Sequence, residues 1–301
     1  MAAVGTVGVV GLGTMGAGIA QVCVQAGLRT VASELTTELA ERGRGIVERG
    51  LARHVEKGRI TPEERDAALA QLTTTGDIAE LADCDLVIEA APEQPSVKRD
   101  VFAALDAAVG AGAVLATNTS ALSVTELAAG SAHPARVVGL HFFNPAPVLP
   151  LVEVVRTELS APEVVETAAE FVVRIGKEPI TCRDTPGFVV NRVLIPVLND
   201  AVRVLDEGTA SAEDIDRGMC LGTRWPIGPL ALIDLIGVDV HVHAAEALWE
   251  AYREPRFAPP ARLVRMLQAG HLGRKSGRGF YAYDDPPASG AVRAREYDRR
   301  P

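Results

Sequence analysis

Short runs of β-branched and apolar residues alternate with longer amphipathic or alanine-rich segments through the first half of the chain. This alternation is typical of βαβ units built around a parallel sheet. It predicts six strands, at residues 6–10, 29–32, 85–90, 114–117, 137–143 and 151–155. Between the second and third strands, a helical pattern over 36–58 is followed by the helix-start sequence Thr61-Pro62-Glu63-Glu64. This segment is expected to be a helical excursion from the sheet.

The pattern changes after Pro186-Gly187, where the alternation of strand and helix stops. Apolar residues recur at helical spacing from Phe188 to Leu205, and Gly208 is a typical helix terminator. Pro196 is expected to kink this helix. Another capped helix start is expected at Ser211.

The predicted fold is therefore α/β: a Rossmann-type doubly wound sheet with a helical excursion, followed by an all-α C-terminal domain. We place the first domain at 1–185, the helical domain at 186–284, and a polar tail that is expected to fray at 285–301.

Composition narrows the functional classes. The 301 residues are 48% hydrophobic and 23% charged, which is ordinary for a globular protein of about two domains. Because 39 acidic residues outnumber 30 basic ones, we expect no nucleic-acid partner. The apolar stretch at 7–10 is too short for a signal peptide core or a membrane span. The dispersed cysteines suggest no disulfide framework and no metal site, which fits the cytoplasm; they are Cys23, Cys84, Cys182 and Cys220.

A glycine motif, Gly11-Leu12-Gly13-Thr14-Met15-Gly16, directly follows the first predicted strand and opens a helix. Its glycines allow a tight turn, close approach of a pyrophosphate and close helix packing. By itself the motif could equally be a glycine-rich turn between strand and helix. Glu34, at the end of the second strand, would bind both ribose hydroxyls of NAD and repel the 2′-phosphate of NADP, although it could instead cap the next helix. Together these features predict an NAD site and a hydride-transfer enzyme.

A dehydrogenase needs a base near the carboxyl ends of the strands. His141 lies near such an end, and Glu153 is a lone carboxylate in the next apolar strand, where it could orient the imidazole. A purely structural pair is the alternative. The polar run Thr117-Asn118-Thr119-Ser120 also follows a strand, and Asn191 is either a cleft amide or a helix-packing amide.

The chain resembles the short-chain form of the L-3-hydroxyacyl-CoA dehydrogenase family, the 3-hydroxybutyryl-CoA dehydrogenases. The resemblance covers 4–283, and its motifs are GLGTMGAGIA at 11–20, TNTS at 117–120, HFFNP at 141–145, LVEV at 151–154, PGFVVNR at 186–192 and LGRKSGRGFY at 272–281. It implies NAD-dependent oxidation of a (3S)-3-hydroxyacyl-CoA to the 3-oxoacyl-CoA, or the reverse, in short-chain fatty acid metabolism.

The resemblance also implies residue roles. His141 would be the general base and Glu153 its orienting partner, while Ser120 and Asn191 would hold the substrate oxygens. The helical C-terminal domain would form a homodimer. The implied cofactor contacts beyond the glycine motif and Glu34 are Glu93, Lys98, Ser120, Asn144 and Lys275.

Three cations at helical spacing on the excursion, Arg49, Arg53 and Lys57, would repel one another unless an anion such as the adenosine phosphate of coenzyme A offsets them. A solvated helix with interleaved glutamates explains them equally well. Lys57 matches a coenzyme A contact of the family, and we take Arg53 and Lys57 as candidate substrate contacts.

The chain departs from the family at Gly50, where some members have a contacting serine, at Pro150, where a lysine is common, and at 223–226. The same chemistry on an acyl-carrier-protein-bound or substituted hydroxyacyl group of a biosynthetic pathway is therefore the alternative function. A 3-hydroxyacid dehydrogenase is disfavoured because it would use a catalytic lysine, and a non-catalytic scaffold because the catalytic set is complete.

Overall fold

The computed structural model describes residues 4–283, so the tail predicted to fray lies outside the described residues. The chain divides into two compact units, Met1–Phe188 and Val189–Pro301.

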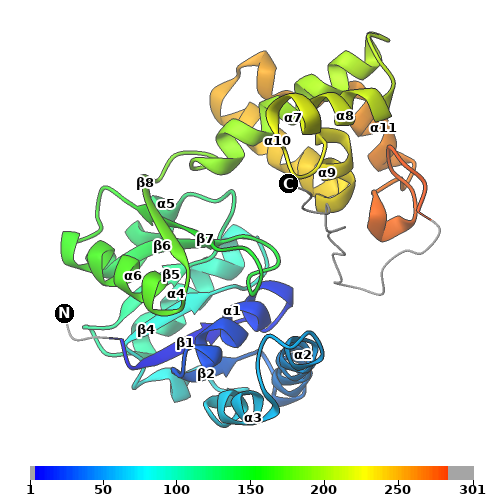
Figure 1. The fold of residues 1–301 in the computed structure, drawn as a ribbon. Helices are drawn as coiled ribbons and strands as arrows, with labels where there is room; N and C mark the ends of the chain where they lie inside the picture. Colours follow the sequence, from blue (N-terminus) through cyan, green and yellow to red (C-terminus); the bar gives the residue numbers. More distant parts are fainter. Residues whose placement is uncertain (1–3, 284–301) are drawn as a thin grey trace. The chain divides into compact units, whose positions relative to one another are not determined.

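The first unit is built on one eight-stranded sheet with the order β3-β2-β1-β4-β5-β6-β7-β8 (Figure 1). All neighbouring strands are parallel except β6 and β7, which are antiparallel. The strands are β1 (Thr6–Val10), β2 (Arg29–Ser33), β3 (Leu72–Thr75), β4 (Leu86–Glu89), β5 (Val114–Thr117), β6 (Val137–Phe142), β7 (Leu151–Arg156) and β8 (Glu178–Arg183).

Six of these strands match the predicted ones, and the two edge strands were not predicted. β3 is only four residues long and consists mainly of threonine, so it carries little apolar signal. β8 contains Pro179, which argues against an interior strand but is tolerated at a sheet edge. Because β3 returns to pair with β2, the helical excursion is in fact the crossover between these two neighbouring strands.

Helices cover both faces of the sheet. They are α1 (Thr14–Gln25), α2 (Thr37–Glu56), α3 (Pro62–Ala70), α4 (Pro95–Ala108), α5 (Val124–Ala129) and α6 (Pro162–Arg174), with short 3₁₀ turns at Ile78–Leu81 and Pro134–Arg136. Strand β4 displays the alternation of such a sheet: Leu86 and Ile88 enter the core beneath α1 and α6, whereas Val87 enters the core beneath α4 and α5. The predicted cap at Thr61 is confirmed as a complete capping box with Glu64.

The second unit is helical over its described residues. Its helices are α7 (Val190–Asp206), α8 (Ala212–Thr223), α9 (Pro229–Ile236), α10 (Val238–Tyr252) and α11 (Ala261–Gln268), with 3₁₀ turns at Pro255–Phe257 and Arg274–Ser276. α7 continues through Pro196 as one helix, and Ser211 caps α8 as predicted. Within 4–283, no helix is both long and apolar enough to cross a membrane.

A buried carboxylate explains the glycine-rich motif near the end of the second unit. The Asp234 carboxylate accepts hydrogen bonds from the backbone N–H groups of Phe280 and Tyr281, and from the Tyr283 hydroxyl. A Cβ at Gly279 would lie 1.9 Å from Asp234 Oδ1, so only glycine permits this approach. The motif therefore folds the last described segment onto α9.

Candidate active site

The antiparallel register of β6 and β7 places His141 directly opposite Glu153. Side chains of directly opposed residues lie on the same face of a sheet. His141 Nδ1 is 2.6 Å from Glu153 Oε2, and both side chains are buried. The structure thus brings together the two residues that the sequence singled out for acid–base chemistry.

The contact with Glu153 sets the tautomer of His141. A carboxylate only accepts hydrogen bonds, so Nδ1 carries a hydrogen, and in the neutral form of the ring Nε2 carries the lone pair. The rings of Phe143 and Phe188 pack against the imidazole, with centroids 4.5 and 5.5 Å away. This arrangement holds the imidazole in one orientation, which is what a general base requires.

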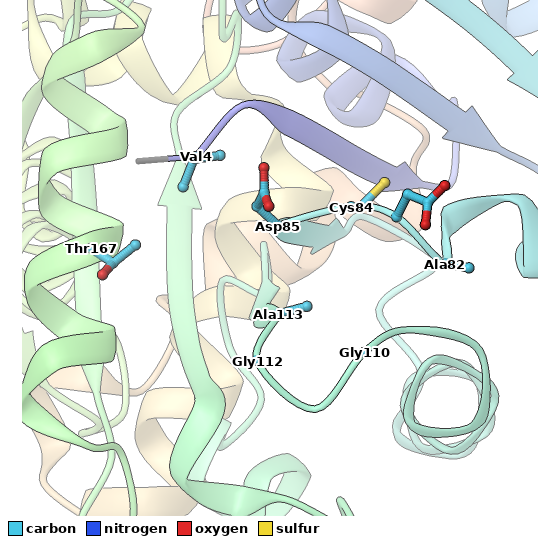
Figure 2. Close-up of a pocket in the computed structure, with 9 residues that line it drawn as sticks. Val4, Ala82, Cys84, Asp85, Gly110, Gly112, Ala113 and Thr167 are labelled. Atoms are coloured by element: carbon cyan, nitrogen blue, oxygen red, sulfur yellow. The ribbon is translucent and has the colours of Figure 1, made fainter. Parts of the chain in front are cut away.

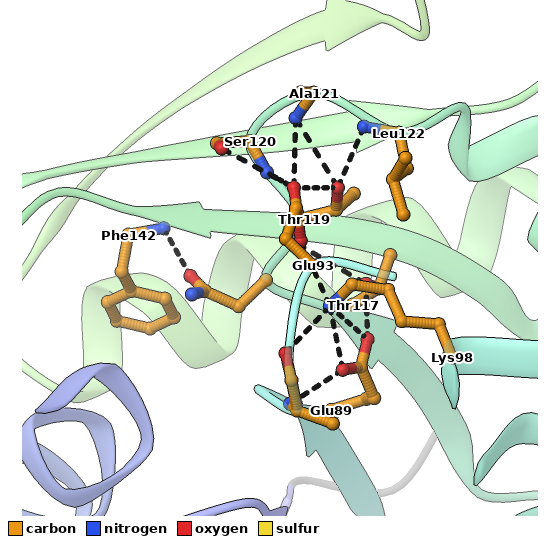
Figure 3. Close-up of polar contacts among 11 residues, drawn as sticks. Glu89, Glu93, Lys98, Thr117, Thr119, Ser120, Ala121, Leu122 and Phe142 are labelled. Carbon is orange, nitrogen blue, oxygen red and sulfur yellow. Dashed lines mark hydrogen bonds and ion pairs between the residues drawn. The ribbon is translucent and has the colours of Figure 1, made fainter. Parts of the chain in front are cut away.

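The loop that carries Ser120 is held by hydrogen bonds to one carboxylate, that of Glu93 (Figure 3). Glu93 Oε1 accepts hydrogen bonds from the Thr119 hydroxyl at 2.6 Å, Ser120 N at 2.8 Å and Ala121 N at 3.1 Å. Burial opposes ionisation of Glu93, but the Lys98 ammonium and these donors outweigh it, so the pKa of Glu93 lies below its usual value. Glu93 is therefore a carboxylate at neutral pH.

Lys98 is almost fully buried beneath this loop. Its ammonium is 2.8 Å from Glu89 Oε1, 3.2 Å from Glu93 Oε2 and 3.2 Å from the Ala91 carbonyl oxygen. Asn118, at the end of β5, accepts a hydrogen bond from Phe142 N and so joins the Ser120 loop to the strand that carries His141. The ends of β4, β5 and β6 form one polar network.

The glycine motif connects β1 to α1 as predicted. Gly11 has a φ of +90°, and a Cβ at Gly16 would lie 1.7 Å from the Gly11 carbonyl oxygen, so both positions require glycine for folding. Gly13 differs, because no atom lies within 4 Å of the place where its Cβ would be. Gly13 is also the N-cap of α1, and no side chain caps that helix. An open approach to the N-terminus of a helix is a binding site for an anion such as a pyrophosphate.

Glu34 follows β2 and lies beside this loop. Its Oε1 accepts a hydrogen bond of 2.7 Å from Leu12 N. The alternative role of Glu34 as a helix cap is wrong, since the Thr36 side chain caps α2 by accepting a hydrogen bond from Leu39 N. The open Gly13, the uncapped helix and the half-buried Glu34 together fit a dinucleotide.

The cationic residues Arg49 and Arg53 are exposed on α2, and Lys57 is exposed at the C-cap of the same helix. Among residues 4–283, no carboxylate forms a salt bridge with any of them, and the interleaved Glu48 pairs with Arg44. At Gly50, a Cβ would lie 2.1 Å from the side-chain oxygen of Gln21. The neighbouring Gln21 side chain thus occupies the space that a serine at position 50 would need.

The remaining predicted site residues are spread over both units. Asn144 is exposed immediately after β6. In the second unit, half-buried Asn191 lies in the first turn of α7, and Lys275 Nζ is 2.6 Å from Asp239 Oδ2. Lys275 thus has an ion-pair partner within its own unit.

A cavity of about 300 Å³ lies away from this network (Figure 2). Its lining includes Val4, Cys84, Asp85 and Ala113, which lie one or two residues before the first residues of β1, β4 and β5. Ligands of open parallel sheets bind at the carboxyl ends of the strands. This cavity therefore lies at the amino-terminal ends of the strands, opposite to the ends that carry the candidate active site.

The sequence analysis missed Glu89, although the same signal that identified Glu153 was present. Glu89 is a lone carboxylate at the end of the apolar run Leu86-Val87-Ile88, and it is fully buried. Its partners, Lys98 and Thr117, are 9 and 28 positions away in the sequence. Nothing in the local pattern indicates that these three side chains meet.

Comparison with known proteins identifies relatives along nearly the whole chain. Residues 6–185 match the model for the 3-hydroxyacyl-CoA dehydrogenase NAD binding domain, and residues 187–283 match the model for the C-terminal domain of the same family. A 3-hydroxybutyryl-CoA dehydrogenase of Mycobacterium tuberculosis is 46% identical and covers 93% of this chain and 99% of its own.

Two further relatives are informative. The crystal structure of (S)-3-hydroxybutyryl-CoA dehydrogenase from Ralstonia eutropha has a TM-score of 0.90 at 41% identity, covering 94% of this chain and all of that one. A 3-hydroxyadipyl-CoA dehydrogenase of Escherichia coli is 43% identical over 92% of this chain, which corresponds to 58% of the longer relative.

Proposed function

The chain belongs to the 3-hydroxyacyl-CoA dehydrogenase family, and we propose that it interconverts (3S)-3-hydroxybutyryl-CoA and acetoacetyl-CoA with NAD. The observation that carries this proposal is the buried pair of His141 and Glu153, joined at 2.6 Å beside the carboxyl end of a Rossmann-type sheet. A short acyl chain is supported by the 3-hydroxybutyryl-CoA dehydrogenases among its relatives.

In the oxidative direction, the His141 Nε2 lone pair takes the proton of the substrate hydroxyl. Glu153 holds Nδ1–H in place and stabilises the imidazolium that forms, because its negative charge lies 2.6 Å away and both side chains are buried. In the reductive direction, the imidazolium returns the proton to the new hydroxyl oxygen.

Ser120 and Asn191 hold the reacting oxygens of the substrate in this proposal. The position of Ser120 is supported by its backbone bond to Glu93 at the end of β5. Asn191, on the first turn of α7, matches the family motif PGFVVNR. Both side chains donate hydrogen bonds, as stabilising the developing charge on an oxygen requires.

The glycine motif from Gly11 to Gly16 and Glu34 hold NAD, with further contacts from Glu93, Ser120, Asn144 and Lys275, while Lys98 contributes by holding Glu93. Acceptance of the hydride from carbon 3 of the substrate is the chemistry that NAD supplies when bound. The carboxylate of Glu34 selects NAD over NADP, since it would repel a 2′-phosphate.

Arg53 and Lys57 bind the phosphate groups of coenzyme A. Their lack of a carboxylate partner among the described residues supports this role, because unpaired cations at helical spacing repel one another until an anion binds. Similar cations would also receive an acidic carrier protein, so the carrier-bound substrate is the competing possibility. A truncated pantetheine thioester, which lacks the nucleotide, separates the two.

The protein acts in short-chain fatty acid metabolism, in the cytoplasm, as a homodimer formed by its second unit. The four cysteines are free, as in a reducing compartment. A dimer is supported by exposed apolar side chains on the second unit, among them Val193 at 63%, Leu221 at 70% and Val240 at 49%.

The proposal is tested by following NADH consumption with acetoacetyl-CoA, 3-oxoadipyl-CoA and the acetoacetyl pantetheine thioester. We expect fastest turnover with acetoacetyl-CoA and slower turnover with the pantetheine thioester. His141→Ala should lower kcat by about two to four orders of magnitude, and His133→Ala, an exposed histidine before β6, is the matched control. Unchanged turnover of His141→Ala would refute the assignment of the base.

A further inference from the structure

Glu89 is a fully buried carboxylate that the proposed mechanism does not use. Both of its oxygens are saturated with donors (Figure 3). Oε1 accepts from Lys98 Nζ at 2.8 Å and from Ala91 N at 2.7 Å, while Oε2 accepts from the Thr117 hydroxyl at 2.6 Å and from Lys98 Nζ at 3.0 Å. Glu89 thus fixes the end of β4, the end of β5 and the Lys98 side chain together.

Lys98 has no donor to spare. An ammonium group has three N–H bonds, and those of Lys98 are directed to Glu89, to Glu93 and to the Ala91 carbonyl oxygen. While these contacts hold, Lys98 acts on ligands through Glu93 rather than by touching them.

Glu93 connects the buried Lys98 ammonium to the loop that carries Ser120. One of its oxygens faces Lys98 at 3.2 Å, and the other holds the Ser120 loop through Thr119, Ser120 N and Ala121 N. The Glu93 side chain is 38% exposed, so without the buried cation it would be free to rotate into solvent. The position of the Ser120 loop therefore depends on consecutive contacts from Glu89 to Lys98 and from Lys98 to Glu93.

Stability alone does not account for these charges. Buried ion pairs are often replaced by apolar residues of similar volume without loss of stability. An apolar pair at positions 89 and 98, however, could not hold the Glu93 carboxylate in place. The network therefore provides geometry at Ser120 more than free energy of folding.

We propose that Glu89 is a positioning residue for the reaction, and that it acts through Lys98 and Glu93 to hold Ser120 where the substrate oxygen binds. The catalytic part of this inference rests on the proposed function. The structural part, that Glu89 orders the Ser120 loop, does not depend on it.

The test is Glu89→Gln, compared with Asp106→Asn as the matched control. Asp106 also pairs with a buried cation, Arg136, at 2.7 Å in the same unit, but its partners do not include the Ser120 loop. Glu89→Gln should lower kcat with acetoacetyl-CoA about 10- to 100-fold, because small misplacements of this kind have such effects. Asp106→Asn should keep the wild-type kcat.

Amide hydrogen exchange provides the readout that needs no substrate. In Glu89→Gln, the amides of Ser120 and Ala121 should exchange at least about tenfold faster than in the wild type and in Asp106→Asn. Wild-type exchange at these amides, or equal loss of kcat in both variants, would overturn the inference. If the wild type does not turn over acetoacetyl-CoA, the proposed function fails, yet the exchange rates still decide whether Glu89 orders the loop.

If Glu89→Gln does not fold, the same two measurements on Thr117→Val test the inference. This substitution keeps the shape of the side chain and removes one donor to Glu89 and one acceptor for Thr119 N. It should speed exchange at Ser120 and Ala121 and lower kcat about threefold to tenfold. Wild-type values of both quantities would overturn the inference.

Discussion

Gly13 and Gly16 belong to the same motif but have opposite surroundings, and this difference predicts opposite behaviour on substitution by alanine. At Gly13, a Cβ meets no atom within 4 Å, and the backbone has a φ of −65°, which any residue adopts. At Gly16, a Cβ would lie 1.7 Å from the Gly11 carbonyl oxygen. Gly13 is therefore required for the ligand, and Gly16 for the fold.

The magnitudes follow from these contacts. Gly13→Ala loses a favourable helix N-cap, which costs about 0.5–1 kcal/mol, but restricts the unfolded chain, which contributes about as much stability. The midpoint of thermal unfolding, Tm, should thus stay within about 2 °C of the wild type. Gly16→Ala forces a displaced backbone, which costs about 1–3 kcal/mol and lowers Tm by about 2–12 °C for a unit of this size.

Binding of NADH should be weakened by Gly13→Ala, the variant that leaves Tm nearly unchanged. The new methyl group of Gly13→Ala covers the N–H groups at the start of α1, so at least one charge-assisted hydrogen bond of about 1.5–3 kcal/mol is lost. The Kd for NADH should rise about 10- to 150-fold. Thermal unfolding of the protein without cofactor and titration of NADH fluorescence measure the two effects separately. A Gly13→Ala protein with the wild-type Kd would refute the placement of the pyrophosphate.

Three further predictions concern side chains outside the glycine motif. Glu34→Ala should raise the Kd for NADH about tenfold and reduce the preference over NADPH, measured by the same titration. The double variant Arg53→Ala, Lys57→Ala should raise KM for acetoacetyl-CoA about tenfold while leaving KM for the pantetheine thioester unchanged in steady-state assays. Burial lowers the pKa of His241 from 6.5 to about 4. The unfolded chain therefore binds this proton more readily, so about 3 kcal/mol of unfolding free energy should be lost between pH 6.5 and pH 4, as urea titrations would measure.

Each of these predictions has a matched control variant. Glu38→Ala removes an exposed carboxylate near Glu34 and should leave cofactor preference intact. Arg42→Ala removes an exposed cation from the same helix as Arg53 and should leave KM unchanged. For His241, His241→Gln should flatten the loss of stability below pH 6.5, and an unaltered slope would contradict its assignment to this residue.

Local patterns in the sequence were sufficient for much of this protein. The glycine motif is contiguous, and its position between a strand and a helix follows from the hydrophobic periodicity on either side. His141 and Glu153 could be paired in advance because both lie in strongly apolar strands that are consecutive in the chain. The capping residues at Thr61 and Ser211 were identified for the same reason, since a cap acts within three residues.

Only the tertiary structure revealed the contacts between distant segments. The edge strands β3 and β8 are stabilised by pairing with one neighbour, and their own residues carry little signal. The apolar run before Glu89 indicates a lone carboxylate in a buried strand, but its partner Thr117 comes from the next strand of the sheet. Sequence periodicity reports which face a residue presents, whereas the identity of its partner depends on strand order and register. The sequence therefore determined the chemistry that is available, and the folded sheet decided which of these groups act together.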